Sequence, residues 1–112
     1  MKIVKVYEVP EASNPHKVSM RPLHDTEHVQ VNIFDLQPGE SLKLHTTPVD
    51  AFFYILEGRG VVVVGSEEQE VSADMLVDSP ARIPHLLRNT GEGVFRFLVV
   101  KTPRQAGPTQ FN

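Results

Sequence analysis

The histidines are the side chains of this 112-residue sequence that could best bind a metal ion, because the chain contains no cysteine. The absence of cysteine rules out a thiol nucleophile, an iron–sulfur cluster and a thiolate zinc site. A metal ion would therefore have to be bound by imidazole, carboxylate and water ligands. The five histidines are His16, His24, His28, His45 and His85.

Serine nucleophiles have no support in the sequence. Ser41, Ser66, Ser72 and Ser79 lie outside any nucleophile-elbow motif, and no glycine-rich phosphate loop precedes a helical segment. The pattern of the chain therefore indicates neither a catalytic triad built on serine nor a nucleotide-phosphate site.

The charge of the chain argues against two classes of partner. The formal net charge is -3, and the lysines and arginines are scattered along the sequence. A protein that binds nucleic acid or an anionic membrane would carry a concentrated basic patch, so we expect neither partner. No apolar run approaches the ~20 residues of a membrane helix, and Lys5 stands where the apolar core of a signal peptide would begin. The sequence therefore predicts a cytoplasmic protein.

The elements that position the histidines are expected to be strands. Sixteen valines and six threonines against five alanines favour β-structure, since β-branched side chains pack well on pleated sheets. Prolines and glycines recur too often for a long helix. The length fits one all-β domain. Strands are predicted at residues 3–9, 28–34, 42–47, 51–57, 61–64, 70–72, 75–79, 86–88 and 94–101.

These strands divide the chain into three regions. We expect an N-terminal strand and a polar, proline-interrupted arm over residues 1–25, a barrel over residues 26–102, and a tail over residues 103–112 that is ordered only where it docks. The strands at 51–57 and 61–64 are predicted to pair as a hairpin across a tight turn at Gly58 and Gly60.

Two of the predicted strands are apolar along their whole length. Residues 52–56 and 61–64 carry no alternation of apolar and polar side chains, which indicates that both faces of each strand are covered. In a chain this small, the second cover is expected to be another subunit. The pattern therefore predicts a homodimer.

Two segments carry sequence motifs. The first contains Gly39, His45 after five residues, and Gly58 at its end; the second contains Pro80, His85 and Asn89. In order and in spacing, the two resemble the paired motifs of the cupin superfamily. The resemblance covers about residues 26–102 and is closest to small single-domain bacterial and archaeal cupins. It implies a jelly-roll barrel, a double-stranded β-helix, which is commonly dimeric and holds one metal on three histidines and one glutamate.

The metal ligands are where the sequence departs from the family. The resemblance places the four ligand positions on His45, Thr47, Ala51 and His85. Only the two histidines can bind a metal, because a threonine hydroxyl is a poor ligand beside imidazole and alanine offers none. Two neutral imidazoles would leave a divalent ion without an anionic protein ligand. A metal site of the family's standard composition is therefore absent.

Three other residues could add a ligand to this incomplete set. His28 would face the barrel if its side of the strand at 28–34 does. Asp78 stands where the family usually has an apolar side chain, either at a solvated strand end or in the barrel mouth. Asp50 adjoins Ala51 and would need a β-bulge to point inward. With such a ligand, His45 and His85 would hold one divalent ion of Fe, Mn, Ni, Zn or Cu.

The ligand pocket is predicted in the mouth of the barrel. Alternation along 51–57 places Phe53 and Ile55 inside and Phe52 and Tyr54 outside. The pocket residues are expected to be His45, Thr47, Phe53, Asp78, His85 and Leu87.

Three further residues near these motifs or in the arm receive no firm chemical role. Arg82 occupies a glycine position of the family, where it would either meet an anionic group or lie in solvent. His16 and His24 belong to the proline-rich arm and are expected to be exposed.

Function follows from the site rather than from the fold. We expect a protein that binds a small molecule in the barrel mouth, with a divalent metal weakly held or absent. The alternative is a metal-dependent oxygenase or isomerase acting on a small metabolite. A metal-free acid–base catalyst using His85 or Asp78, and an interaction protein with a vestigial barrel, are further alternatives, and the sequence does not decide whether the protein is an enzyme.

Overall fold

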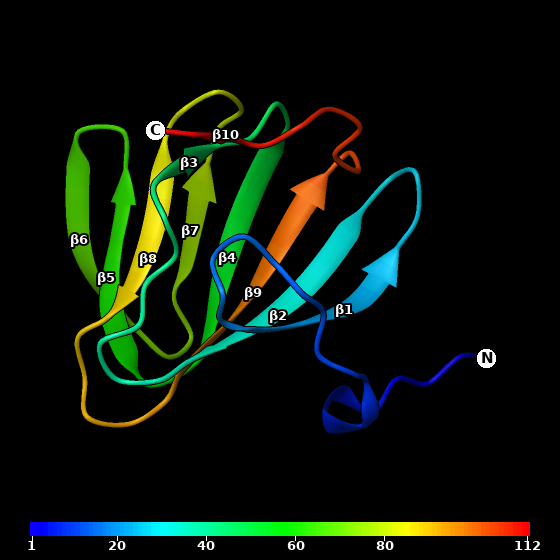
Figure 1. The fold of residues 1–112 in the computed structure, drawn as a ribbon, viewed down its shortest axis with the longest axis horizontal. Coiled ribbons are helices and arrows are strands. Elements are labelled where there is room, and N and C mark those ends of the chain that lie inside the picture. Colours follow the sequence, from blue (N-terminus) through cyan, green and yellow to red (C-terminus); the bar gives the residue numbers. More distant parts are fainter.

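The computed structural model describes all 112 residues and consists of two antiparallel five-stranded sheets that face each other (Figure 1). One sheet has the order β1-β2-β9-β4-β7 and the other β10-β3-β8-β5-β6. The prediction of an all-β jelly-roll fold is confirmed. The strands are β1 (Ser19–Asp25), β2 (Gln30–Leu36), β3 (His45–Thr46), β4 (Asp50–Glu57), β5 (Arg59–Val64), β6 (Glu67–Ser72), β7 (Leu76–Ser79), β8 (His85–Asn89), β9 (Phe95–Thr102) and β10 (Gln110–Phe111).

The core lies between the sheets, and alternation along β4 and β8 shows how the strands supply it. On β4, Phe53 and Ile55 are buried, whereas Phe52 and Tyr54 are only half-buried, as the sequence predicted. Period-2 burial of this kind arises because successive side chains of a strand point to opposite faces. The core cluster comprises Phe34, Leu36, Leu42, Phe53, Ile55, Val62, Val71, Leu87, Phe95, Phe97 and Val99.

The expected hairpin between residues 51–57 and 61–64 is wrong. β4 pairs with β7 and β9, whereas β5 pairs with β6 and β8 in the other sheet. Gly58 and Gly60 allow the chain to pass from the first sheet to the second between β4 and β5. A Cβ on Gly58 would lie 2.1 Å from the carbonyl oxygen of Val94, and Gly58 itself has a left-handed φ of +82°. The apolar runs on either side are thus inner strands of two different sheets.

The N-terminal region also differs from the expectation. Residues 3–9 form no strand; they contain only the 3-10 turn η1 (Val6–Glu8). This turn is held by Tyr7, whose ring lies beneath the guanidinium groups of Arg21 and Arg96 and whose hydroxyl donates to Asp35. These side-chain contacts hold the N-terminal segment against the first sheet, although it does not pair with any strand. None of the helical segments in the structure has the length and hydrophobicity of a membrane span.

The segment predicted as a loose arm contains a strand. Residues Ser19–Asp25 form β1 and pair with β2 at the edge of the first sheet. Proline at position 22 is tolerated because an edge strand has one side free of ladder hydrogen bonds. The tail docks through β10, whose Gln110 and Phe111 pair with β3.

The motif positions at which the resemblance expects glycine have a left-handed backbone, even where this chain has another residue. Gly39 and Gly58 have positive φ angles, and so do Asp74 (φ 69°) and Arg82 (φ 66°), which stand where the second motif has glycine. A left-handed backbone is what glycine is used for, and aspartate and arginine adopt it here at some conformational cost. The alignment of both motifs with this sequence therefore agrees with the backbone conformation at these four positions.

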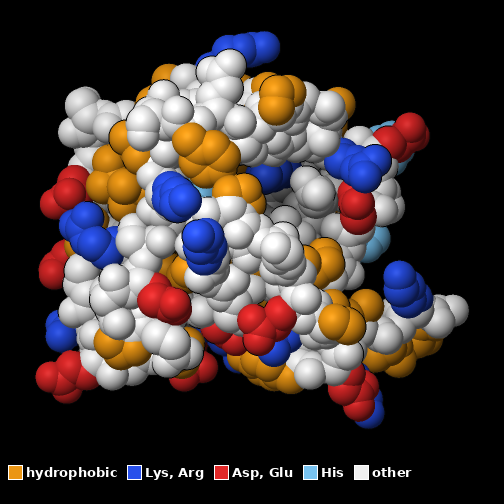
Figure 2. All heavy atoms as spheres, in the orientation of Figure 1, with side chains coloured by type: hydrophobic (Ala, Val, Ile, Leu, Met, Phe, Trp, Pro, Cys, Tyr) orange, Lys and Arg blue, Asp and Glu red, His pale blue; other side chains and the backbone are white.

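Charged side chains are interspersed on the surface. Figure 2 shows basic and acidic groups mixed over one face of the molecule, with apolar side chains between them. A face with mixed charges does not produce a strong electrostatic potential of one sign.

Candidate functional site

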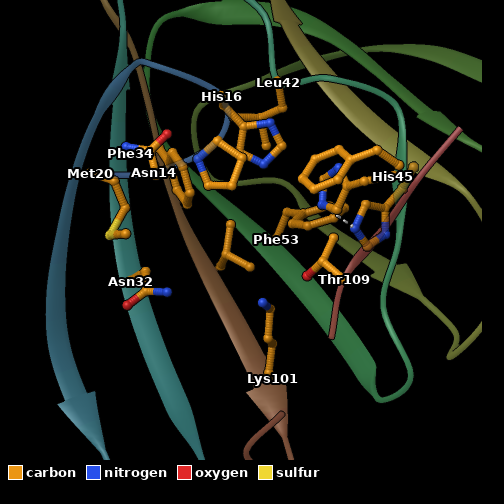
Figure 3. Close-up of a pocket in the computed structure, with 14 residues that line it drawn as sticks. Asn14, His16, Met20, Asn32, Phe34, Leu42, His45, Phe53, Lys101 and Thr109 are labelled. Carbon is orange, nitrogen blue, oxygen red and sulfur yellow. Dashed lines mark hydrogen bonds between the residues drawn. The ribbon is translucent and has the colours of Figure 1, made fainter. Parts of the chain in front are cut away.

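A cavity of about 130 Å³ lies between the two sheets at one end of the barrel (Figure 3). The strands supply its walls, and two segments from the ends of the chain close over it. His16 comes from the arm that precedes β1, and Phe111 comes from β10 in the tail. Both chain ends are therefore part of the site, although neither belongs to the two sequence motifs.

The two motif histidines meet in this cavity. β3 pairs with β8 through His45 and His85, which stand opposite each other in the ladder. Their Nε2 atoms are 3.0 Å apart, and their rings meet edge to face with centroids 4.4 Å apart. The remaining ring nitrogens are also engaged, since His45 Nδ1 lies 2.6 Å from the carbonyl oxygen of Lys43 and His85 Nδ1 lies 2.6 Å from the hydroxyl of Ser79.

The direction of each hydrogen bond follows from the partners. The carbonyl oxygen of Lys43 can only accept, so His45 carries its proton on Nδ1 and its Nε2 accepts. His85 must then donate from Nε2, which leaves its Nδ1 to accept the hydroxyl proton of Ser79. The result is a continuous chain of neutral hydrogen bonds from Ser79 through both imidazoles to the backbone.

Burial keeps these imidazoles uncharged. Loss of solvation, together with the charges of neighbouring cationic groups, lowers the pKa of His85 to about 3. Burial also lowers the pKa of His45, although its hydrogen bond to the Lys43 carbonyl opposes the shift. Two neutral rings that share one proton between their Nε2 atoms fit the hydrogen-bond chain, whereas a charged ring would have to donate from both nitrogens.

His16 is the main residue of the site that sequence reasoning missed. It was expected to be exposed, but its ring packs 4.7 Å from that of His45 and 5.7 Å from that of Phe111. Its Nδ1 accepts the backbone N–H of Lys43, so in the neutral ring the proton lies on Nε2. Burial lowers the pKa of His16 to about 4. No local pattern in the arm predicts the hydrogen bond between His16 and Lys43, because the two residues are 27 positions apart.

Lys101 is the second residue that was missed, and here a signal existed. Along β9 the inward positions are Phe95, Phe97 and Val99, and the same alternation continues to Lys101. The side chain reaches into the cavity, as Figure 3 shows. Burial lowers the pKa of its ammonium group. A lysine on the inward face of a core strand is a departure from the burial pattern that marks a mouth residue.

The other predicted pocket residues are distributed differently. Phe53 lines the cavity, with its ring 5.1 Å from that of His85. Thr47 is buried beside the pair, but its hydroxyl donates to the Val49 carbonyl and it does not line the cavity. Leu87 is fully buried in the core. The structure thus brings three of the six predicted pocket residues to the cavity wall.

The proposed additional metal ligands lie elsewhere. Asp78 is exposed on β7 because its neighbour Ser79 takes the inward position. His28 precedes β2 in an exposed turn, where it contacts Glu27. Asp50 accepts the backbone N–H of Ala81. None of these carboxylate or imidazole groups lines the cavity with His45 and His85.

Comparison with known proteins supports this architecture. The family model for the cupin domain matches residues 32–101, which includes both motifs and the strands that carry the histidine pair. The chain belongs to the cupin family. TT1209 from Thermus thermophilus is 33% identical, with 93% of this chain and 99% of that chain covered and a TM-score of 0.80. An uncharacterized protein of Methanocaldococcus jannaschii, MJ0764, is 29% identical over 104 residues, 90% of this chain and 86% of its own.

A less similar solved structure shows the fold alone. The polyketide cyclase RemF from Streptomyces resistomycificus is 23% identical, with 99% of this chain and 84% of that chain covered and a TM-score of 0.84. The cupin described here is therefore a small member with bacterial and archaeal relatives of similar length.

The donor set of this cupin does not fit the metal that its family implies. The structure contains no group of three or more histidine, aspartate or glutamate side chains placed to hold an ion. His16 does not complete the set, since its Nδ1 accepts the Lys43 N–H and its Nε2 then carries the proton of the neutral ring. At the two remaining family ligand positions, Thr47 uses its hydroxyl to donate to the Val49 carbonyl and Ala51 has no donor atom, so no anionic ligand accompanies the two imidazoles.

Proposed function

We propose that this cupin binds a small molecule directly through its protein side chains, in the cavity where His45 and His85 meet. The observation that carries the proposal is the hydrogen bond between the two Nε2 atoms in the wall of a cavity of about 130 Å³. The position that the family uses for a metal is thus part of a polar wall, and the space in front of it is left to a ligand.

The lining of the cavity supports a ligand with both polar and apolar parts. Phe53, Phe34 and Val99 supply an apolar floor, whereas Lys101 and Asn32 supply polar groups. Ligand sites of soluble proteins commonly combine mostly apolar walls with a few placed polar groups. The volume is close to that of an engineered cavity of about 150 Å³ that binds benzene, so the enclosed part of the ligand is small.

A fragment screen tests the proposal. We expect small compounds to shift the NMR signals of the His45, His85 and Phe53 side chains. In the variant Asn32→Phe, the added ring fills the cavity and the shifts should disappear. Asp78→Asn is the matched control, because Asp78 is exposed and lies outside the cavity. A screen in which fragments bind the Asn32→Phe variant as well as the parent would contradict the proposal.

Metal content provides a separate test. Untagged protein purified without chelator is expected to contain Fe, Mn, Ni, Zn and Cu well below one equivalent, and chelator is expected to leave fragment binding unchanged. One equivalent of a divalent metal whose removal abolishes fragment binding would overturn the metal-independent part of the proposal.

A further inference from the structure

The charge of the cavity wall is unbalanced. Among the fourteen residues that line the cavity, Lys101 is the only lysine or arginine, and no aspartate or glutamate is present. The ammonium group of Lys101 therefore provides the positive charge of the wall, and no carboxylate of the wall balances it. A partly buried cation is normally paired with an anion from the protein.

The register of the sheet explains why Lys101 has no acidic side chain opposite it. On β9 it stands opposite Gln30 of β2 on one side and Ala51 of β4 on the other. Ala51 in turn stands opposite Ser79 of β7, which holds His85. Directly opposed residues on one face of a sheet have Cβ atoms about 5 Å apart, so this row places a methyl group between the lysine and the histidine pair.

Ala51 is the position at which the sequence motif has lost the acidic residue of the family. A carboxylate there would have faced Lys101 across the ladder and neutralised it. With alanine, the lysine keeps one hydrogen bond within the chain, from Nζ to Gln105 Oε1 at 2.7 Å. The ammonium group has three N–H donors, so two remain for a ligand.

We propose that the cavity selects small monocarboxylates with a short apolar or aromatic group, whose carboxylate is bound by Lys101 in the cavity wall. This inference rests on the proposed small-molecule function and names its ligand class. The Nε2–H of His16 and the amide of Asn32 are further donors in the wall. The apolar end of the ligand packs against Phe53 and the other aromatic side chains of the cavity.

The single cation and the apolar wall favour a carboxylate over a phosphate. A phosphate group carries close to two negative charges at neutral pH and is usually bound by several donors from arginine, lysine or a helix N-terminus. One lysine surrounded by aromatic and aliphatic side chains matches one negative charge attached to an apolar group.

Benzoate and benzamide are matched probes for this inference. They have nearly the same shape, but only benzoate is charged at neutral pH. We expect NMR titration to show benzoate binding at least about tenfold more tightly than benzamide, as a charge-assisted hydrogen bond in a desolvated site requires. Lys101→Met should remove this preference, and Lys101→Arg should retain part of it.

A substitution at the neighbouring position gives an independent test that leaves Lys101 in place. Ala51→Glu supplies an internal carboxylate opposite the lysine and should weaken benzoate binding at least about tenfold. Ala51→Gln is its isosteric neutral control and should weaken it less. Circular dichroism and the thermal midpoint of each variant confirm that the fold is retained before the affinities are compared.

The outcomes separate the ligand class from the proposed function. Equal binding of benzoate and benzamide, or a preference for benzoate that survives Lys101→Met, overturns the carboxylate inference and leaves small-molecule binding standing. Tighter binding of inorganic phosphate than of benzoate also overturns it. If neither probe nor any fragment of the screen perturbs the His45 and Phe53 signals, both proposals fail.

Discussion

The Nε2 atoms of His45 and His85 lie 3.0 Å apart, and the partners of the other two ring nitrogens fix the direction of the hydrogen bond between them. The pair is part of a chain that runs from the hydroxyl of Ser79 to the carbonyl of Lys43. In a cupin this position is associated with a metal, but here the donor and acceptor roles of both rings are satisfied by protein groups.

The tautomers of the two rings are a direct prediction. At pH 7, His45 should carry its proton on Nδ1 and His85 on Nε2, because the Lys43 carbonyl accepts and the Ser79 hydroxyl donates. Long-range proton–nitrogen NMR spectra of the imidazole rings distinguish the two forms. A proton on Nδ1 of His85 would contradict the hydrogen-bond chain.

Loss of the Ser79 hydroxyl should destabilise the protein. Ser79→Ala leaves the Nδ1 acceptor of a buried imidazole without its donor, which typically costs about 1–3 kcal/mol of unfolding free energy. Urea unfolding measures the difference. Ser72→Ala, at an exposed position of β6, is the control and should change stability by less than about 0.5 kcal/mol. Equal effects of the two substitutions would show that the Ser79 hydrogen bond contributes nothing measurable.

Stability should fall as the pH is lowered from about 7 to about 4. In the unfolded chain a histidine has a pKa near 6.5, whereas His16 and His85 have values of about 4 and about 3 in the folded protein. Between these values the unfolded state binds more protons, so the folded state is favoured at higher pH and loses stability as pH falls.

A variant of His16 isolates part of this dependence. His16→Phe keeps an aromatic ring beside Phe111 but cannot be protonated, so the decline of the unfolding free energy between pH 7 and pH 4 should become shallower. His28→Gln alters an exposed histidine and should leave the parent slope unchanged. A slope that is the same in all three proteins would exclude a contribution from His16.

Metal binding should return when the two missing ligands are restored. The double variant Thr47→His with Ala51→Glu supplies the four ligand types of the family at positions flanking His45 and His85. We expect it to retain close to one equivalent of a divalent metal after desalting, as measured by elemental analysis, whereas Ala51→Gln should retain none. A folded double variant that binds no metal would mean that the backbone no longer holds these positions in ligand geometry.

The dimer predicted from the apolar strands has a surface on which it can be tested. Tyr54 and Leu98 stand opposite each other on the outer face of the first sheet, and both are half-buried in the single chain. Light scattering after gel filtration should give a dimer mass for the parent and a monomer mass for Leu98→Arg. Glu92→Arg introduces the same residue at an exposed loop position and should remain dimeric. A monomeric parent would overturn the prediction.

The inward face of β4 was predictable because the side chains of a strand alternate between its two faces with period 2. The alternation that placed Phe53 inside and Tyr54 outside is visible in the sequence and is retained in the structure. The resemblance of the two motifs to those of cupins likewise implied that His45 and His85 lie near each other, because the family places both in one metal site. The hairpin error has the opposite cause, because a run of apolar residues reports that a strand is buried but not which strand lies beside it.

The sequence by itself determined an all-β cupin barrel, a histidine pair without the family's other two metal ligands, and the inward positions of β4. The tertiary structure decided what surrounds that pair. His16 reaches it from a loop, Phe111 from the tail, and Lys101 faces an alanine across the ladder. Such contacts join segments far apart in the chain. Local periodicity shows which side chains of a strand are buried, but it does not show which residues pack against them.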